Sequence, residues 1–174
     1  MLLQNFCMAM AVPIAGSYGT SEYNIIKQTD GTYTALDATP SYIRSLSGEF
    51  YNDVGTQPSV GSNYKGIILG TGTTPPTYSD YKMENYNTGL TYSNRTATWS
   101  APNMILTESA TNNKDASIIV SEVGVFGMED KNAGYKKILF TRNVIEPITI
   151  KPNETKTFTV KINFDKFSDA YSVS

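Results

Sequence analysis

The chain has 174 residues, which is enough for one domain that buries about 70% of the surface exposed by its unfolded form, so folding requires neither disulfides nor a metal. Its 14 Lys and Arg residues balance 16 Asp and Glu residues without a run of like charge, which argues against a nucleic-acid groove and against a funnel for acidic substrates. Histidine is absent and Cys7 is the single cysteine, which excludes Ser-His-Asp and Cys-His nucleophiles and zinc sites built from His or several Cys. A pair of catalytic carboxylates and an all-oxygen Ca²⁺ or Mg²⁺ site remain compatible with this composition.

The first third of the sequence predicts a peripheral region. The apolar side chains of residues 1–12 have the spacing of a short helix, with a buried strand as the alternative. A secretory signal has basic residues before its apolar part, and this segment has none. Residues 13–62 are rich in Gly, Ser, Thr and Tyr, with a turn signal at Asp30-Gly31, and predict either edge strands or an arm that orders against a neighbouring subunit. We therefore expect an N-terminal arm or edge-strand region over residues 1–62 and a core over residues 63–174.

A short apolar strand is expected over Tyr64–Gly70, followed by a loop with the sequence TGTTPP. The loop and the preceding glycine resemble the start of a dinucleotide-binding loop, but the third glycine is missing and the two prolines oppose a helix. Gly70 and Gly72 are therefore expected to serve the geometry of the backbone.

The next stretch predicts one helical turn and two strands. Ser79 or Asp80 is expected to cap a short helical turn over Tyr81–Tyr86. The alternation over Leu90–Ser109 is typical of strands, and Pro102 divides it, because proline cannot donate a hydrogen bond within a sheet. Two strands are therefore expected here.

The clearest pattern lies in the last part of the chain. Ser117–Phe126 and Tyr135–Thr141 predict strands joined by the polar loop Glu129–Gly134. A later strand has one apolar face, made of Phe158, Val160, Ile162 and Phe164. The turn residues Lys151–Glu154 predict a hairpin between this strand and the apolar Ile148-Thr149-Ile150. Together these patterns predict an all-β, antiparallel fold.

Individual residues in these strands carry two interpretations each. Glu122 lies between valines, and the pattern favours a solvent-facing side chain because a buried charge needs a partner; the alternative is a buried carboxylate paired with Arg95 or Arg142. Gly124 and Gly127 indicate a bulge or close packing more than a ligand site.

No catalytic, cofactor-binding or metal-binding residue is assigned from the sequence. Trp99 favours a core position, with a sugar-stacking platform as the alternative. The acidic residues show no spacing typical of a calcium loop; they are Glu84, Asp115, Glu122, Glu129, Asp130 and Glu154.

Several motifs, in their order, resemble those of small structural proteins of tailed bacteriophage particles. They are Ile67-Ile68-Leu69, Gly70–Pro76, Ser79-Asp80-Tyr81, Ser121–Phe126, Leu139–Val144 and Ile148–Thr155. The resemblance covers Tyr64–Phe164 and implies a β-sandwich of the tail, neck or head appendages, with a glycine loop, a Glu-aliphatic-Gly strand and a closing hairpin. We expect this sandwich to be jelly-roll-like, with long loops and an extended or partly helical N-terminal segment.

The expected function is that of a virion structural or assembly protein without enzymatic activity or cofactor. Its expected partners are further copies of itself, in a ring or trimer, and other virion structural proteins, joined by apolar faces and strand addition, without direct contact to nucleic acid or membrane. The alternatives are a secreted carbohydrate-binding β-sandwich module, a capsid decoration protein and a glycosidase-like enzyme, which would need two carboxylates about 5–10 Å apart.

Overall fold

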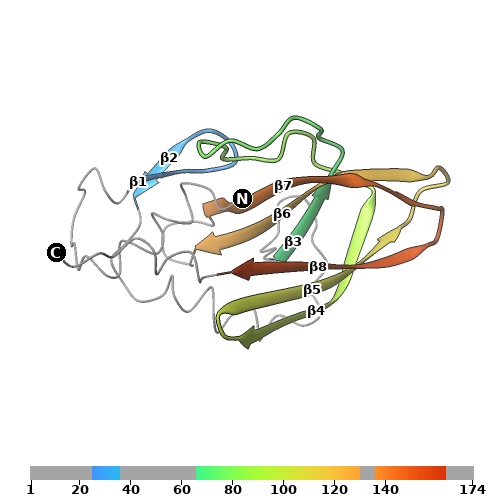
Figure 1. Cartoon of the computed structure of the whole chain (residues 1–174). Helices are drawn as coiled ribbons and strands as arrows, with labels where there is room; N and C mark the ends of the chain where they lie inside the picture. The colour runs from blue at the N-terminus through green and yellow to red at the C-terminus, as the bar shows by residue number, and fades with distance from the viewer. Residues whose placement is uncertain (1–24, 36–65, 130–135, 164–174) are drawn as a thin grey trace.

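The computed structural model describes residues 25–35, 66–129 and 136–163, and the regular structure within these ranges consists of strands (Figure 1). The strands are, in chain order, β1 (Ile25–Lys27), β2 (Tyr33–Ala35), β3 (Gly66–Gly70), β4 (Leu90–Ser100), β5 (Asn103–Asn112), β6 (Ile118–Glu129), β7 (Lys136–Ile150) and β8 (Thr155–Asn163). The expectation of an all-β, antiparallel fold is confirmed for this part of the chain.

The strands form two three-stranded sheets and one two-stranded sheet. One large sheet has the order β3-β6-β7 and the other has the order β4-β5-β8, while β1 and β2 pair with each other. The chain passes from one large sheet to the other between β3 and β4, between β5 and β6, and between β7 and β8. Successive pairs of strands therefore contribute to different sheets.

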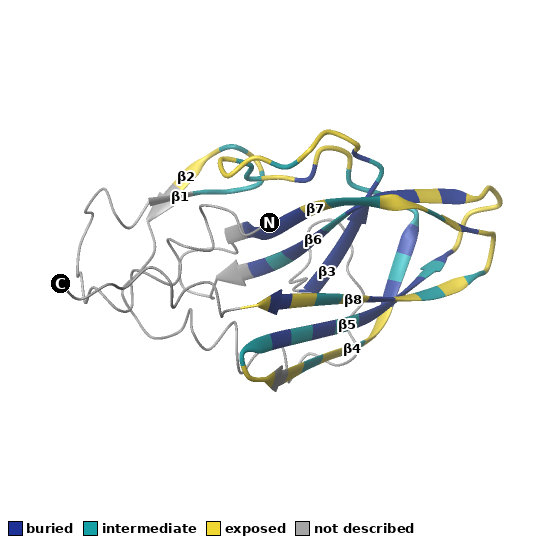
Figure 2. Cartoon of the chain, in the orientation of Figure 1, coloured by how far each residue is buried: buried dark blue, intermediate teal, exposed yellow. Residues whose placement is uncertain are grey.

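Both large sheets contribute to one hydrophobic core. The buried apolar side chains come from all six strands of the two sheets and from the β3–β4 loop, which contributes Met83. Figure 2 shows buried residues along the middle of the strands and exposed residues at the turns. Residues of this core include Ile67, Leu69, Leu106, Val120, Leu139, Ile150, Phe158 and Ile162.

The alternation predicted for the last strand is confirmed. Phe158 and Ile162 in β8 are buried and Val160 packs against the core, whereas Thr157 and Thr159 are exposed. The residue expected to end this face, at position 164, lies outside the described residues. An extended chain places alternate side chains on opposite faces, so β8 buries one face only.

The hairpin predicted around Lys151–Glu154 is wrong. The turn itself is present, since the Glu154 N–H donates to the Lys151 carbonyl at 3.0 Å and Asn153 has a φ of 59°. However, β7 pairs with β6 and β8 pairs with β5, so the turn connects two sheets. Ile150 before the turn and Phe158 after it can thus enter the same core from different sheets.

Two other predictions concern connections. The strands expected on either side of Pro102 are confirmed as β4 and β5. The turn at Asp30-Gly31 is confirmed between β1 and β2, where Gly31 has a φ of 89° and the Asp30 carboxylate accepts hydrogen bonds from the N–H and the hydroxyl of Thr32. The rest of the predicted arm or edge-strand region, residues 1–24 and 36–62, and most of the predicted loop Glu129–Gly134 lie outside the described residues.

We predict that Ile162→Asp destabilises the fold far more than Lys161→Asp. Ile162 is 4% exposed, so the substitution places an unpaired charge in the core, while the neighbouring Lys161 faces solvent. The expected loss in the free energy of unfolding is about 3 kcal/mol or more for Ile162→Asp and about 0.5 kcal/mol for Lys161→Asp. Urea denaturation followed by circular dichroism measures both, and equal losses would contradict the assignment of the two faces of β8.

Candidate functional site

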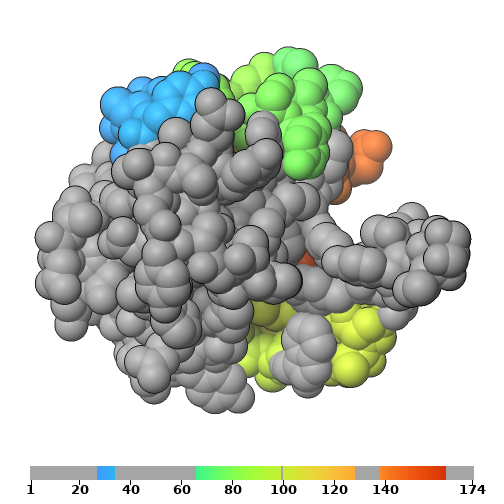
Figure 3. Space-filling model, turned by 90° about the vertical axis from the view of Figure 1, so that its left-hand side faces the viewer, coloured from blue at the N-terminus to red at the C-terminus, as the bar shows by residue number. Residues whose placement is uncertain are grey.

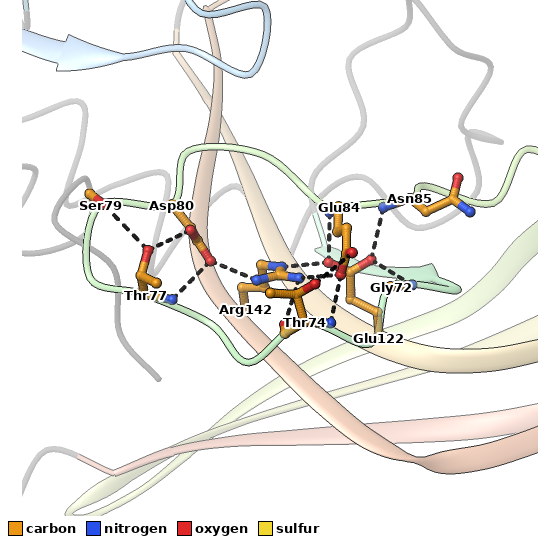
Figure 4. A network of polar contacts seen from close by, with 9 residues as sticks. All are labelled: Gly72, Thr74, Thr77, Ser79, Asp80, Glu84, Asn85, Glu122 and Arg142. Atoms are coloured by element: carbon orange, nitrogen blue, oxygen red, sulfur yellow. Dashed lines mark hydrogen bonds and ion pairs between the residues drawn. The ribbon is translucent and has the colours of Figure 1, made fainter.

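The largest polar cluster of the described residues surrounds the guanidinium of Arg142 in β7 (Figure 4). Its Nε donates to Glu122 Oε1 at 2.5 Å and Nη1 donates to Asp80 Oδ2 at 2.7 Å. Nη2 donates to Glu84 Oε2 and to the Thr74 carbonyl, both at 3.1 Å. One strand side chain thereby holds both ends of the β3–β4 loop segment 74–84.

Glu122 in β6 is completely buried and binds the backbone of the same loop. Its Oε1 accepts from the Glu84 N–H at 2.8 Å, and its Oε2 accepts from the N–H groups of Asn85 at 3.2 Å and Gly72 at 3.3 Å. A buried carboxylate is tolerated only when a cation and hydrogen-bond donors compensate for its lost hydration. The Arg142 guanidinium and these three N–H groups provide that compensation.

The glycines at the end of β3 and at the start of the loop, Gly70 and Gly72, are explained by this carboxylate. A Cβ atom at Gly70 would lie 2.5 Å from Glu122 Oε2, and one at Gly72 would lie 2.6 Å from it. The outer face of the sheet is equally tight at Gly124, where a Cβ atom would lie 2.7 Å from the Met83 sulfur. The glycines therefore allow the loop to approach the sheet closely.

The other two carboxylates of the cluster are held by short local turns. Asp80 accepts from the Thr77 N–H at 3.0 Å and from its hydroxyl at 2.6 Å, while Glu84 accepts from the Thr74 N–H and hydroxyl, both at 2.8 Å. Burial acts to raise the pKa of Asp80, but the hydrogen bonds from Thr77 and Arg142 outweigh it and lower the pKa. The bonds from Thr74 are the largest cause that lowers the pKa of Glu84.

The pKa shifts of Asp80, Glu84 and Arg142 favour their charged forms. Burial acts to lower the pKa of Arg142, but the hydrogen bonds to Glu122 and Asp80 outweigh it and raise the pKa. A general acid requires a carboxyl pKa that is raised, whereas those of Asp80 and Glu84 are lowered. The guanidinium also takes the position between the carboxylates that a cation would need, and no group of acidic residues in the described ranges fits a metal ion. The geometry is suited to holding the loop.

A second buried ion pair lies between the two large sheets. Arg95 in β4 donates through Nε and Nη2 to Glu108 Oε1, both at 3.2 Å, and Glu108 Oε2 accepts from the Ile67 N–H at 2.9 Å. The register of β4 against β5 shifts between Ser93 and Thr96, which turns Arg95 inward toward Glu108. A polar contact thus joins β4 and β5 to the edge strand β3.

Tyr92 completes the contact along the same edge. Its hydroxyl oxygen accepts from the Leu69 N–H at 3.0 Å, two residues beyond the Ile67 N–H that Glu108 binds. Burial is the largest cause that raises the pKa of Tyr92, so the hydroxyl stays neutral. Two successive N–H groups on the outer edge of β3 are therefore occupied by side chains of the other sheet.

The far end of the two sheets is held by Asn112. Its side-chain amide donates to the carbonyls of Ala116 and Ile150, both at 2.9 Å, and its Oδ1 accepts from the Lys114 N–H at 2.8 Å. Its backbone bonds with Asn153 and Glu154 in the β7–β8 turn. This one buried residue fixes both connections between the sheets at this end.

Exposed aromatic side chains gather where the β1–β2 hairpin meets the β3–β4 loop. The Lys27 ammonium lies 3.9 Å from the centre of the Tyr81 ring and 5.5 Å from that of Tyr33. Figure 3 shows the hairpin, in blue, beside the loop, in green. Tyr33 is 69% exposed and Tyr78 in the loop is 54% exposed. Such cation–π contacts stabilise modestly.

Several interpretations of single residues are decided by this geometry. The expectation that Glu122 faces solvent is wrong, because the β3–β4 loop covers it, and the alternative of a buried pair with Arg142 is correct. The helical turn expected over Tyr81–Tyr86 is wrong: the backbone N–H groups of this stretch bond to Glu122, and Tyr86 forms a bridge with Gly70.

The remaining candidates lie elsewhere. The side chain of Trp99 lies outside the described part of the chain. Asp115 lies in the β5–β6 connection, and Glu154 accepts from the Lys151 N–H in the β7–β8 turn, while the side chains at positions 129 and 130 are not described. The structure thus brings Glu84 and Glu122 together and adds Asp80 to them.

Two important residues were not identified from the sequence. Glu108 has the same parity in β5 as the buried Met104, Leu106 and Ala110, and this alternation is the signal that marks it as inward-facing. Asn112 lies in the same alternation, which also marks it as inward-facing, but its carbonyl partners at Ala116 and Ile150 give no signal in the sequence.

Comparison of the chain with protein families, with curated proteins and with solved structures found no match. Within the described ranges there is no helix that is long and apolar enough to cross a membrane. The function is therefore inferred from the contacts described above.

We predict that Arg142→Met is costly because it leaves the buried Glu122 carboxylate without its cation. The expected loss is about 3 kcal/mol in the free energy of unfolding, and Glu122→Gln in the same chain should recover at least about 1 kcal/mol of it. Lys156→Met is the control, since Lys156 pairs with Glu154 at 3.7 Å near the surface and should lose less than about 1 kcal/mol. Urea denaturation that gave equal losses for Arg142→Met and Lys156→Met would contradict the role of the cluster.

We further predict that the cluster opens in acid. The pKa values of Asp80 and Glu84 are lowered from ordinary values of 3.8 and 4.5, so folding favours the ionised forms. Their contribution to stability is complete above the ordinary values and is lost as pH falls through the lower folded ones. The amide resonances of Thr77 and Thr74 should titrate below pH 3.8 and 4.5, respectively, in nuclear magnetic resonance spectra.

The control for this titration is Thr77→Val, which removes the hydroxyl bond to Asp80 and should raise only the midpoint reported by residue 77. Midpoints at or above the ordinary values in the unsubstituted chain would show that the ionised carboxylates do not hold the loop.

Proposed function

We propose that the chain is a non-enzymatic structural and assembly protein of a tailed-phage virion that acts through interfaces between subunits. The order of motifs from Ile67 to Thr155 supports the virion, in its tail, neck or head appendage. In this proposal the two large sheets pack as a β-sandwich of jelly-roll-like type, supported by the core to which both contribute. The partners are further copies in a ring or trimer and other virion structural proteins.

The observation that carries the proposal is that the buried charged side chains bind the chain's own backbone. Glu122 accepts from three loop N–H groups, Glu108 accepts from an N–H of β3, and Arg142 donates to a loop carbonyl. Each contact fixes a loop or strand relative to a sheet, and both Arg–Glu pairs are buried. Such use of costly buried charge supports a rigid body whose surface, and not a catalytic cleft, carries the function.

A second candidate function is carbohydrate binding, and the exposed tyrosines favour it. Tyr33 and Tyr78 are both more than half exposed, and Lys27, in the hairpin that carries Tyr33, lies over the Tyr81 ring. Flat aromatic rings stack on sugars, and hydroxyl and ammonium groups can bond to sugar hydroxyls. The same surface would equally suit a subunit contact, since tyrosine is enriched in interfaces.

We predict that the chain is a fixed component of virus particles. Particles purified from a culture of the source, analysed by quantitative mass spectrometry, should contain the chain in a constant ratio to the major capsid protein. Washing at high salt should not remove it, because apolar and backbone contacts hold subunits together. Detection in the lysate but not in the particles would refute the virion proposal.

The same experiment separates the second candidate. A chain absent from particles that binds a glycan array, with binding lost in Tyr33→Ala and Tyr78→Ala but kept in Ile119→Ala on β6, would establish carbohydrate binding instead. A chain in particles without glycan binding would support the assembly function alone.

A further inference from the structure

The four outer edges of the two large sheets differ in how well they can accept another strand. At β3 the N–H groups of Ile67 and Leu69 are occupied by Glu108 and Tyr92. At β7 the pairing with β6 is irregular between Val120 and Glu122, and Pro147 on β7 provides no N–H group. These two edges are therefore poor acceptors.

The edges of the other sheet differ from each other. The β4 edge is interrupted by the bulge between Ser93 and Thr96, where Asn94 has a φ of 52°. In contrast, β8 pairs with β5 from Thr155 to Asn163 without a shift of register and without a proline. Among the described strands, β8 thus has the regular outer edge that strand addition requires.

The backbone groups on this edge follow from the alternation of antiparallel pairs. Asn112 and Glu154 form a hydrogen-bonded pair, since the Asn112 N–H donates to the Glu154 carbonyl. Residues along β8 then alternate between groups that face β5 and groups that face outward. The outward-facing residues are Thr155, Thr157, Thr159, Lys161 and Asn163.

The side chains agree with this assignment. Residues in the non-hydrogen-bonded pairs of an antiparallel ladder have closer side chains than residues in the hydrogen-bonded pairs. Three such pairs are joined by their hydroxyl groups: Thr111 with Thr155, Ser109 with Thr157, and Thr107 with Thr159. The outward backbone groups of β8 therefore belong to residues whose side chains bond across to β5.

We propose that β8 of one copy pairs antiparallel with β8 of a second copy about a two-fold axis at Thr159, which joins two β4-β5-β8 sheets into one. This inference rests on the proposed assembly function and adds a two-fold contact, which would join copies from two rings or trimers because a two-fold contact alone gives a dimer. About Thr159, outward-facing residues meet outward-facing residues, and the pairs from Thr157 to Lys161 exchange roughly six backbone hydrogen bonds, within the number found in specific interfaces.

In this register, the side chains of the two β8 strands that lie opposite each other suit one another. On the core side Phe158 meets Val160 of the second copy, an apolar pair that stabilises neighbouring strands. On the outer side Lys161 meets Thr157, so lysines do not lie opposite each other. Lys156 meets Ile162 and keeps its ion pair with Glu154. No like charges therefore oppose the pairing directly.

The test compares proline substitutions on the two edges of the β4-β5-β8 sheet in the full chain. Thr159→Pro removes an outward N–H group of β8 and should weaken self-association at least about tenfold in Kd, measured by sedimentation. Thr159→Val keeps this N–H group and should associate as the unsubstituted chain does. Ala97→Pro is the matched control on β4, where Ala97 pairs with Leu106 and its N–H group faces away from β5 by the same alternation.

A cross-linking experiment keeps the proposal testable if Thr159→Pro fails to fold. In a Cys7→Ala chain, Thr159→Cys should be joined into dimers by a short bismaleimide, whereas Thr98→Cys on β4 should not. A monomer at all concentrations without this cross-link would overturn the proposal, as would equal loss of association in Thr159→Pro and Ala97→Pro. Presence of such a monomer in particles would reject the β8 pairing alone, while a dimer absent from particles would reject only the virion assignment.

Discussion

The buried ion pair between Glu122 and Arg142 is the interaction on which the outer side of the β3-β6-β7 sheet depends. A fully buried carboxylate must be compensated, and here the compensation comes from Arg142 and from N–H groups of the β3–β4 loop. The loop is consequently drawn onto the sheet, which leaves no room for a Cβ atom at Gly70 or Gly72. Met83 is carried into the core by the same segment, so a polar contact also positions an apolar one.

The loop in turn provides a position for the β1–β2 hairpin, through Lys27 on the Tyr81 ring. The loop also carries the exposed Tyr78, and Figure 3 shows the hairpin beside the loop. The exposed aromatic surface is thus a consequence of a charge pair buried beneath the loop. In physical terms, hydrogen bonds to an ionised carboxylate hold the loop on the sheet, and the loop carries exposed aromatic side chains.

The second ion pair, Arg95 with Glu108, has a different consequence. Together with Tyr92 it occupies the outer N–H groups of β3, so that this edge is closed by side chains of the other sheet. Bulges at β4 and β7 disturb two more edges, and β8 retains a regular one. Bulges and bonded N–H groups commonly protect the edges of sheets, so an added strand can bind only at an edge that lacks them. The internal polar contacts therefore close the edge of β3, which leaves β8 as the edge for the proposed pairing.

The sequence alone determined the strands, because alternation depends only on neighbours along the chain: β8, the division at Pro102 and the turn at Asp30-Gly31 were all predictable. The same alternation carries the signal that Glu108 faces inward, but this residue was not identified from the sequence. The sequence could not determine that β8 pairs with β5 across the Lys151–Glu154 turn, since the same turn residues suit a hairpin and a crossing between sheets. Only the tertiary structure decided that Glu122 is buried, because the loop that covers it and the arginine that neutralises it are brought to it by the pairing of distant strands.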